Sequence, residues 1–320
     1  MDPITKFIFA AGGGSKGPFD LNFLVIAGGG GGGSGAPVGA GQEAGGGAGG
    51  YISSWDPSRT GGNQEGSGGN TTALQPLSLE PNVQYTITVG AAGAADTNGS
   101  LSRFQGTDSN GTAFDILAQG GGKGAGNGAP YGYDNGGSGG GGSWTQLTYY
   151  TWARGNGTTG QGFEGGHGYA SSTSVGGGTM TFCNAFGPGQ WCTPVDYGTG
   201  GGGGAGGAGS NGSAYGGAGG RGMDSTITGT NVNRAGGGPG YGLYGGSGWH
   251  PLLDQGSEGC GGSGVYGVAT DGGIILRYPI NYTISNPGGG LTMTSGWTGG
   301  YYSSLENCTK ITGAGAIEFT

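Results

Sequence analysis

The sequence predicts a mostly irregular, all-β fold with little or no α-helix, in which polyglycine II helices are bundled with short β-strands. Glycine supplies 93 of the 320 residues, about four times its average share of roughly 7%. The glycines come in blocks instead of at every third position, which excludes collagen. No segment shows the period of an amphipathic helix, whereas several short apolar runs have the composition of β-strands.

The glycine blocks are the main energetic problem of the chain. Ordering a glycine costs about 0.5–1 kcal/mol more than ordering an alanine, and hydrophobic residues make up only 32% of the sequence. Dense backbone hydrogen bonding must therefore stabilise the blocks, and the extended polyglycine II helix permits it because its N–H and C=O groups point outward in three directions. Flexible linkers are the alternative interpretation. The blocks are residues 28–33, 45–50, 136–142, 176–178, 200–209, 216–222, 236–240 and 259–264.

Short apolar or alternating runs predict the strands. The composition changes after Pro279, which predicts a glycine-rich polyglycine II domain over residues 1–279 and a small C-terminal β-module over residues 280–320. The strands at 6–11 and 316–320 could pair with another chain by strand addition. The expected strands are residues 6–11 and 21–27, which lead into the glycine-rich domain, and residues 84–89, 113–118, 273–278, 281–285, 291–295, 301–304 and 316–320.

The charge pattern excludes several classes of partner. Ten Lys and Arg residues face 18 Asp and Glu residues, which gives a net charge of −8 without any basic cluster. Nucleic acid is not expected as a partner, because phosphate binding requires clustered Lys and Arg. We expect no signal peptide, since the first residues lack a cationic segment followed by an apolar one. No apolar run is long enough to predict a membrane span.

Few groups could support catalysis, so we expect no enzyme activity, no cofactor and no metal. The two histidines, His167 and His250, lie apart from any carboxylate pair with metal-ligand spacing, and the four cysteines form no CxxC motif. Residues 136–140 match the G-x-S-x-G pattern of a nucleophile elbow, but no apolar strand precedes them and this composition produces such matches by chance. Asp254 and Glu258 are the nearest approach to a carboxylate pair, and we expect them on a solvated turn.

Polar segments rich in aromatic residues interrupt the glycine blocks. Tyr and Trp offer a large rigid contact area with a polar group, which suits stacking on sugar rings or docking to a protein. The alternative is that they cover the sides of the glycine bundle. Cys183 and Cys192 could close a disulfide at the base of one such segment. The candidate receptor or partner contacts are Tyr131, Tyr133, Trp144, Tyr149, Tyr150, Trp152, Phe182, Phe186, Trp191, Tyr244 and Trp249.

The order of these motifs resembles that of the glycine-rich-domain structural proteins of tailed phages. The resemblance covers nearly the whole chain, and a tail from Tyr282 to Phe319 is similar to a β-module that often follows such domains. It implies strands on either side of a turn at residues 99–104. The motifs are FLVIAGGGGGG at 23–33, GGGAGGY at 45–51, YTITVG at 85–90, GSLSRF at 99–104 and GGIILRYP at 272–279.

The resemblance implies a virion structural protein of the tail-fibre or tail-tip-adhesin type, exposed on the tail or the capsid surface. Its implied partners are other virion proteins and a host-surface glycan or outer-membrane protein, and a homo-oligomer is compatible with it. The chain departs from the adhesins in having no long shaft and no autoproteolytic module, and in its insertions at 143–155 and 179–197. A capsid or tail decoration (cement) protein and an extracellular filament subunit, both purely structural, stay open as alternatives.

Overall fold

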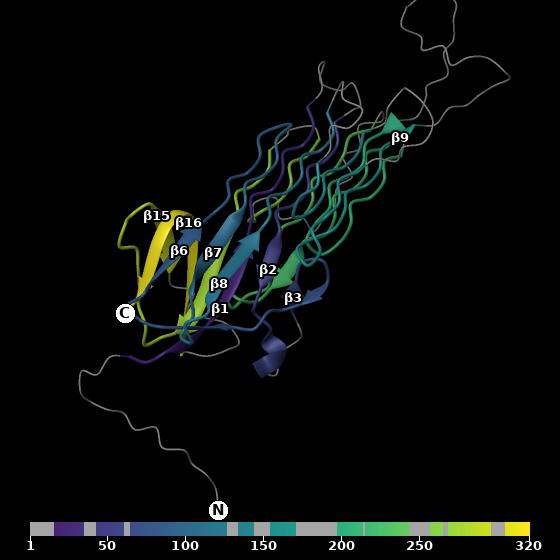
Figure 1. Cartoon of the computed structure of the whole chain (residues 1–320). Helices are drawn as coiled ribbons and strands as arrows, with labels where there is room; N and C mark the ends of the chain where they lie inside the picture. Colours follow the sequence, from purple (N-terminus) through teal and green to yellow (C-terminus); the bar gives the residue numbers. More distant parts are fainter. Residues whose placement is uncertain are drawn as a thin grey trace, which may run out of the picture.

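The all-β class predicted from the sequence is confirmed. In the computed structural model, a nearly closed antiparallel β-sheet forms one end of the molecule, and glycine-rich segments extend from it to the other end (Figure 1). The part of the chain that the structure describes contains no α-helix, and its one helical element is a 3-10 turn at Pro57–Thr60. The described residues are 16–34, 43–60, 65–126, 134–143, 154–170, 197–213, 215–242, 257–264, 268–295 and 305–320.

The main sheet has ten strands, and three smaller strand pairs lie outside it. The strands of the main sheet are β1 (Phe19–Ile26), β2 (Tyr51–Ser53), β5 (Leu77–Leu79), β6 (Gln84–Thr88), β7 (Ser102–Thr107), β8 (Ala113–Ala118), β13 (Gly273–Pro279), β14 (Ile284–Ser285), β15 (Leu291–Ser295) and β16 (Glu306–Phe319). The pairs are β3 (Gly66–Ser67) with β4 (Thr71–Thr72), β9 (Tyr169–Ala170) with β10 (Tyr197–Gly198), and β11 (Met223–Ser225) with β12 (Val232–Arg234).

The strand order is β2-β1-β13-β16-β6-β7-β8, with β5 beside the first half of β1 and with β14 and β15 beside β16. The expected division between residues 279 and 280 does not coincide with a break in this sheet, because β16 lies between β13 and β6. The turn expected at residues 99–104 is wrong from Ser102 on, because β7 begins there and pairs with both β6 and β8.

The end of β16 is not free to add to another chain. Ile317 is paired with Tyr85 of β6, and Phe319 is paired with Ile284 of β14. Both edges of this strand are therefore occupied within the chain, and the prediction of strand addition at 316–320 is wrong. The expected strands at 6–11 and 301–304 lie outside the described residues.

Polar contacts close the sheet where β2 and β5, at one edge, meet β8 and the turn before it, at the other edge. We call this line of contact the seam. At one end of the seam, the Ser109 N–H donates to Ser78 O of β5 (2.8 Å). At the other end, Gln161 bridges β2 and β8: its backbone oxygen accepts from Tyr51 N (3.1 Å), and its side-chain Nε2 donates to Leu117 O (3.0 Å). The Gln161 Oε1 also accepts from the Gln119 N–H (2.7 Å). One glutamine from a glycine-rich turn thus replaces the missing strand-to-strand pairing.

The second half of strand β1, residues 23–26, is apolar on both faces and separates two hydrophobic cores. Phe23 and Val25 point into the first core, which the sheet surrounds and which contains the aromatic rings of Tyr85 and Phe319. Leu24 and Ile26 point to the opposite face. The second core, between the sheet and the glycine-rich segments, contains Leu24, Ile26, Ala48, Tyr51, Trp55, Ala205, Ile227, Ala235, Ile275 and Cys308.

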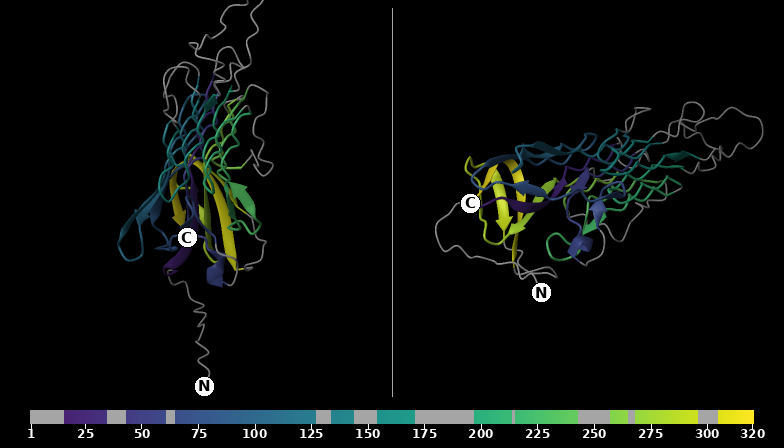
Figure 2. Two further views of the ribbon diagram at one scale, coloured as in Figure 1. Left: turned by 90° about the vertical axis from the view of Figure 1, so that its right-hand side faces the viewer. Right: turned by 60° about the horizontal axis from the view of Figure 1, so that its bottom comes forward.

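The glycine-rich segments form a hydrogen-bonded array, and Figure 2 shows them running side by side away from the sheet. We call this array the glycine lattice. Its members bond to one another chiefly through backbone N–H and C=O groups, so each segment serves as both donor and acceptor. It consists of residues 27–34, 43–50, 89–101, 119–126, 134–143, 154–167, 199–213, 215–222, 235–242, 257–264 and 268–272.

Segment 43–50 lies inside the lattice, and its hydrogen bonds repeat every three residues. Three segments accept its N–H groups at 2.7–3.1 Å, and three other segments donate to its carbonyls. Ala44, Gly47 and Gly50 donate to segment 119–126, Gly45 and Ala48 to segment 199–213, and Gly46 and Gly49 to segment 257–264. The donors to its carbonyls are Ala27, Gly30 and Gly33, then Ser138 and Gly141, then Gly238 and Tyr241.

Segment 199–205 repeats this arrangement. Thr199, Gly202 and Ala205 donate to segment 235–242, and the residues between them donate alternately to segments 134–143 and 207–213. Its carbonyls accept from segments that include 43–50 and 215–222. The described glycine blocks are therefore hydrogen-bonded elements, and the linker interpretation is wrong for them. The block at 176–178 lies outside the described residues.

The alanines of block 200–209 occupy different environments. From the sequence we expect both Ala205 and Ala208 on outward faces or at gaps in the lattice, where a methyl group is tolerated, and Ala208 is exposed. Ala205 is fully buried and belongs to the second core, so its methyl packs on the sheet side instead of facing outward.

Gly202→Ala should destabilise the protein strongly. A Cβ atom at Gly202 would lie 1.9 Å from Gly46 O, and backbone cannot move aside as a flexible side chain can. Overpacking typically costs about 1–3 kcal/mol, and we expect a loss above about 3 kcal/mol because both partners are lattice backbone. The matched control is Gly207→Ala, whose Cβ would meet its nearest atom at 3.5 Å. Denaturant unfolding measures both, and equal stabilities would contradict the close-packed lattice.

Candidate functional site

The two ends of the molecule carry different parts of the chain. Lys16 Nζ donates to Thr320 O (3.1 Å), and Tyr282 Oη donates to Gly17 O (2.7 Å). The first and the last described residues therefore lie together beside the sheet, where Figure 1 marks the C-terminus. The β9–β10 pair lies at the opposite end of the lattice in the same view. We call this opposite end the loop end.

Three connecting segments are attached at the loop end, next to one shared hydrogen-bond cluster. Glu43 follows segment 35–42, and Thr199 and Tyr241 lie within three residues of segments 171–196 and 243–256. Thr199 Oγ1 lies 2.7 Å from Glu43 O and 3.0 Å from Tyr241 O. The Tyr241 N–H in turn donates to Thr199 Oγ1 (2.7 Å). The lattice thus holds these attachment points in fixed relation to one another.

The eleven aromatic residues predicted as partner contacts lie outside the described residues, and so do Cys183 and Cys192. Their flanking residues can be placed: Ser143 and Arg154 bound the segment with Trp144 and Trp152, and Ala170 and Tyr197 bound the one with Trp191. Ala170 and Tyr197 are paired in the β9–β10 ladder, so both ends of that segment start at the loop end.

Two described tyrosines at the loop end were missed by the sequence analysis. Tyr169 in β9 is 38% exposed and Tyr215 is 57% exposed. Tyr169 pairs with Gly198, and the backbone of Tyr215 adjoins Gly198 and Gly242. Each is a single aromatic residue between small or polar residues. Only the folding of the lattice brings them to the same end as the attachment points of segments 171–196 and 243–256.

The catalytic patterns in the sequence do not form an active site in the described part of the chain. Ser138 of the G-x-S-x-G match is completely buried, and its backbone N–H donates to Ala48 O, so it is a lattice residue and no nucleophile elbow. His250 and Asp254 lie outside the described residues. Among the residues the structure describes, no three His, Cys, Asp or Glu side chains could hold a metal together, and no helix is long and apolar enough to cross a membrane.

The described cysteines, Cys260 and Cys308, are buried. Burial in the second core raises the pKa of the Cys308 thiol to about 11. A thiol with so high a pKa is protonated at neutral pH and therefore unreactive.

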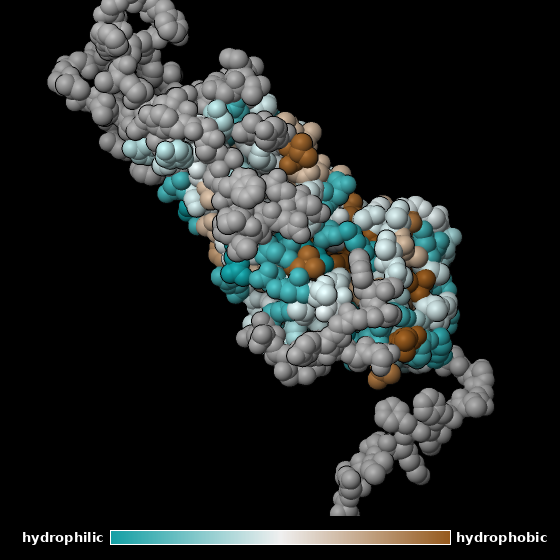
Figure 3. All heavy atoms as spheres, turned by 180° about the vertical axis from the view of Figure 1, so that it is seen from behind, coloured by the Kyte–Doolittle hydropathy of each residue, from teal (hydrophilic) through white to brown (hydrophobic). Residues whose placement is uncertain are grey.

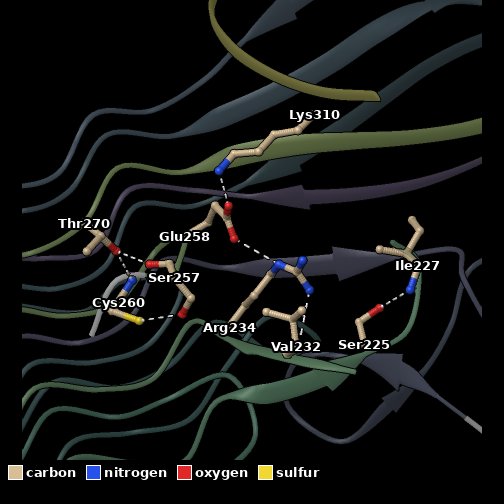
Figure 4. Close-up of polar contacts among 9 residues, drawn as sticks. All are labelled: Ser225, Ile227, Val232, Arg234, Ser257, Glu258, Cys260, Thr270 and Lys310. Carbon is tan, nitrogen blue, oxygen red and sulfur yellow. Dashed lines mark hydrogen bonds and ion pairs between the residues drawn. The ribbon is translucent and has the colours of Figure 1, made fainter. Parts of the chain in front are cut away.

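Glu258 is not on a solvated turn, as the sequence analysis expects, but in a buried ion-pair cluster between lattice and sheet (Figure 4). Arg234 Nε, at the end of β12, donates to Glu258 Oε2 (2.9 Å), and Lys310 of β16 pairs with the other carboxylate oxygen. The side chains of Arg234 and Glu258 are only 5% and 13% exposed. We call Arg234, Glu258 and Lys310 the junction cluster.

The cluster determines the ionisation of its carboxylate. Burial opposes the charged form of Glu258, but the hydrogen bond from Lys310 and the charges of Arg234 and Lys310 outweigh it, so the pKa of Glu258 lies below its usual value. A second pair nearby, Arg277 with Glu306 (2.7 Å), also stacks its guanidinium on the Trp55 ring at 4.4 Å. These charges are fully engaged within the protein and act structurally.

The surface seen from behind is mixed and contains no extended apolar patch among its coloured residues (Figure 3). The exposed large apolar side chains are mostly single residues, and Val268 and Leu305 are the most exposed of them. The described surface thus offers no large hydrophobic interface on this face.

Comparison with known proteins identifies no relative. No family model, no curated protein and no solved structure matches the chain. The functional interpretation therefore depends on the geometry described above and on the order of motifs in the sequence.

Glu258→Gln should lower the free energy of unfolding by about 3–5 kcal/mol at neutral pH, because it leaves buried Arg234 without its partner. Since the folded pKa of Glu258 is depressed, its contribution is present above the unfolded value of about 4.3 and is lost as pH falls through the folded value. Urea unfolding from neutral to acidic pH should show a shallower acid loss in the variant than in the wild type.

The control is Asp115→Asn, which removes the exposed Arg103–Asp115 pair. We expect little change from it, because water and salt screen exposed pairs. If both substitutions had the same small effect, the junction cluster would not hold lattice and sheet together.

Proposed function

We propose that the chain is a virion structural protein of a tailed phage, of the tail-fibre or tail-tip-adhesin type, that presents aromatic-rich segments to the host surface. The observation that carries the proposal is that the two ends of the molecule carry different parts of the chain. The described chain ends lie beside the sheet, whereas the attachment points of segments 35–42 and 171–196 lie at the loop end. Such a molecule is suited to attachment through one end and recognition through the other.

We further propose that the lattice segments are polyglycine II helices. The three-residue repeat of hydrogen-bond partners in segments 43–50 and 199–205 supports this, because a polyglycine II helix has three residues per turn and bonds only to its neighbours. The glycines of these segments also have no positive φ, in agreement with the left-handed helix.

A lattice of this kind is a rigid support for recognition. Interior segments are bonded on all sides, so their backbone entropy is lost on folding and not on binding. Binding segments on a rigid support lose less entropy on contact with a partner, which increases affinity. The polar aromatic composition of residues 144–152 and 179–197 favours a neutral glycan or a protein surface over an anionic polymer, because no basic cluster occurs there.

The sheet end, including residues 280–320, is proposed to attach to other virion proteins. Ile280 and Leu305 are exposed here, and the Ile280 N–H donates to Leu305 O (2.8 Å). The proposal includes no catalytic step. The decoration-protein and filament alternatives use the same lattice as a spacer and differ in where the chain resides.

Trp152→Ala combined with Trp191→Ala should weaken binding of the purified protein to host cells at least about tenfold, because aromatic residues dominate binding energy at such surfaces. The melting temperature should stay unchanged, since neither residue belongs to the described lattice. The control is Leu305→Ser, which changes an exposed side chain at the sheet end. Undiminished binding by the folded double variant would contradict host recognition by these segments.

The location of the chain separates the alternatives. A labelled antibody against the protein should mark the tail tip of virions in electron micrographs. Labelling of the capsid would favour the decoration protein, and labelling of free filaments without virions would favour the filament subunit.

A further inference from the structure

Asn–Gly dipeptides recur in the described chain, at Asn98, Asn110, Asn135, Asn156 and Asn211. This dipeptide is the one most prone to spontaneous deamidation, because glycine has no side chain to hinder attack by its backbone nitrogen on the asparagine side chain. The reaction requires that the glycine nitrogen and the asparagine side-chain carbon approach each other freely. The structure places the five dipeptides in different situations in this respect.

Three of the dipeptides are held by a shared arrangement that we call the Asn–Gly clamp. In each, the asparagine side-chain oxygen accepts a backbone N–H of a neighbouring segment, and the following glycine N–H donates to a carbonyl of that segment. At Asn211 both bonds go to His167 (2.9 and 2.7 Å), and at Asn135 both go to Asn156 (2.7 and 3.2 Å). At Asn98 they go to Lys123 N and Gly121 O (2.8 and 2.9 Å).

The clamp opposes deamidation in two ways. It engages the N–H of the attacking nitrogen, and it holds the side-chain amide toward a neighbouring segment instead of toward its own backbone. Reaction at a clamped site requires both hydrogen bonds to open first. Its rate is therefore proportional to the small fraction of molecules in which the clamp is open.

Asn156 is held differently. Its backbone N–H and C=O are bonded to Asn135 and Gly136, but its side chain is exposed and makes no hydrogen bond to any described residue. The Gly157 N–H likewise donates to no described residue. The backbone bridge to Gly136 uses the Asn156 carbonyl and the Thr158 N–H, which lie on either side of Gly157. Both reacting groups are therefore free, while the backbone around them is fixed.

Asn110 is intermediate between these situations. It lies in the exposed turn between β7 and β8, where the Gly111 N–H donates to Asp108 O (3.0 Å). Its side chain is exposed, as at Asn156, but its attacking nitrogen is engaged.

We propose that Asn156 is the preferred site of spontaneous deamidation among the described Asn–Gly dipeptides. The Gly157 nitrogen loses its proton to solvent and bonds to Asn156 Cγ, and the side-chain nitrogen leaves as ammonia after taking up a proton. The product is a cyclic succinimide. Water then opens the ring at either carbonyl, which gives an aspartate or an isoaspartate.

The location gives the modification a structural consequence. Isoaspartate adds one backbone carbon between residue 156 and Gly157, and the following turn carries Gln161, which bridges β2 and β8. Modified molecules should therefore have a weakened seam and a lower melting temperature than unmodified ones.

The test is to incubate the folded full-length protein at mildly alkaline pH and to map isoaspartate by digestion and mass spectrometry. We expect it to accumulate at Asn156 about tenfold faster than at Asn98, Asn135 or Asn211, because two hydrogen bonds protect each clamp. In denaturant the Asn–Gly sites should react at similar rates. Equal rates in the folded protein, or a faster clamped site, would overturn the proposal.

Asn156→Gln supplies the matched variant. Its longer side chain forms the cyclic intermediate much more slowly and keeps the backbone bonds of residue 156, so the fastest phase of ammonia release should disappear while the initial melting temperature stays unchanged. Persistence of that phase in the folded variant, with isoaspartate mapped to Asn98, Asn110, Asn135 or Asn211, would assign it to one of these residues and refute the proposal.

Discussion

A peptide segment without side chains can be buried only if its neighbours replace every hydrogen bond that water would make with its backbone. In segment 43–50, every N–H from Ala44 to Gly50 donates to one of three neighbours, and three other neighbours donate to its carbonyls, with a repeat of three residues. The same closeness leaves no room for a Cβ at many interior positions, as at Gly46, where it would lie 2.1 Å from Gly30 O. The high glycine content is thus a requirement of backbone-to-backbone packing.

The lattice by itself has few side chains to fix how its segments are aligned, and the sheet supplies that alignment. Strands β1 and β13 are paired in register and continue directly into lattice segments, so strand pairing determines where the glycine segments begin. The second core and the junction cluster then connect the two parts on the same face of the sheet, where Lys310 is paired with Ile275 of the second core. This connection joins the described chain ends, beside the sheet, to the attachment points of segments 35–42, 171–196 and 243–256 at the loop end. The proposed display function is based on this arrangement.

Local sequence predicts much of this structure and fails where the partner is distant. The runs at 113–118 and 291–295 match β8 and β15 because apolar and β-branched residues are concentrated within them. Strand β16 begins at Glu306, ten residues before the expected run at 316–320, because its polar first half is stabilised by β13 and β15, which the sequence does not reveal. The burial of Glu258 and the bridging role of Gln161 depend in the same way on contacts remote in sequence. The aromatic segments predicted for recognition lie outside the described residues, so their role stays a prediction.

Native-state hydrogen exchange tests whether backbone hydrogen bonds make the glycine segments as firmly structured as the sheet. The relevant amides are those of residues 44–50 and 199–205, with β13 as the internal reference. These amides should exchange only through global unfolding, at rates comparable to those of β13. Exchange of the glycine amides at the rate of an unstructured chain, while β13 stays protected, would contradict this prediction.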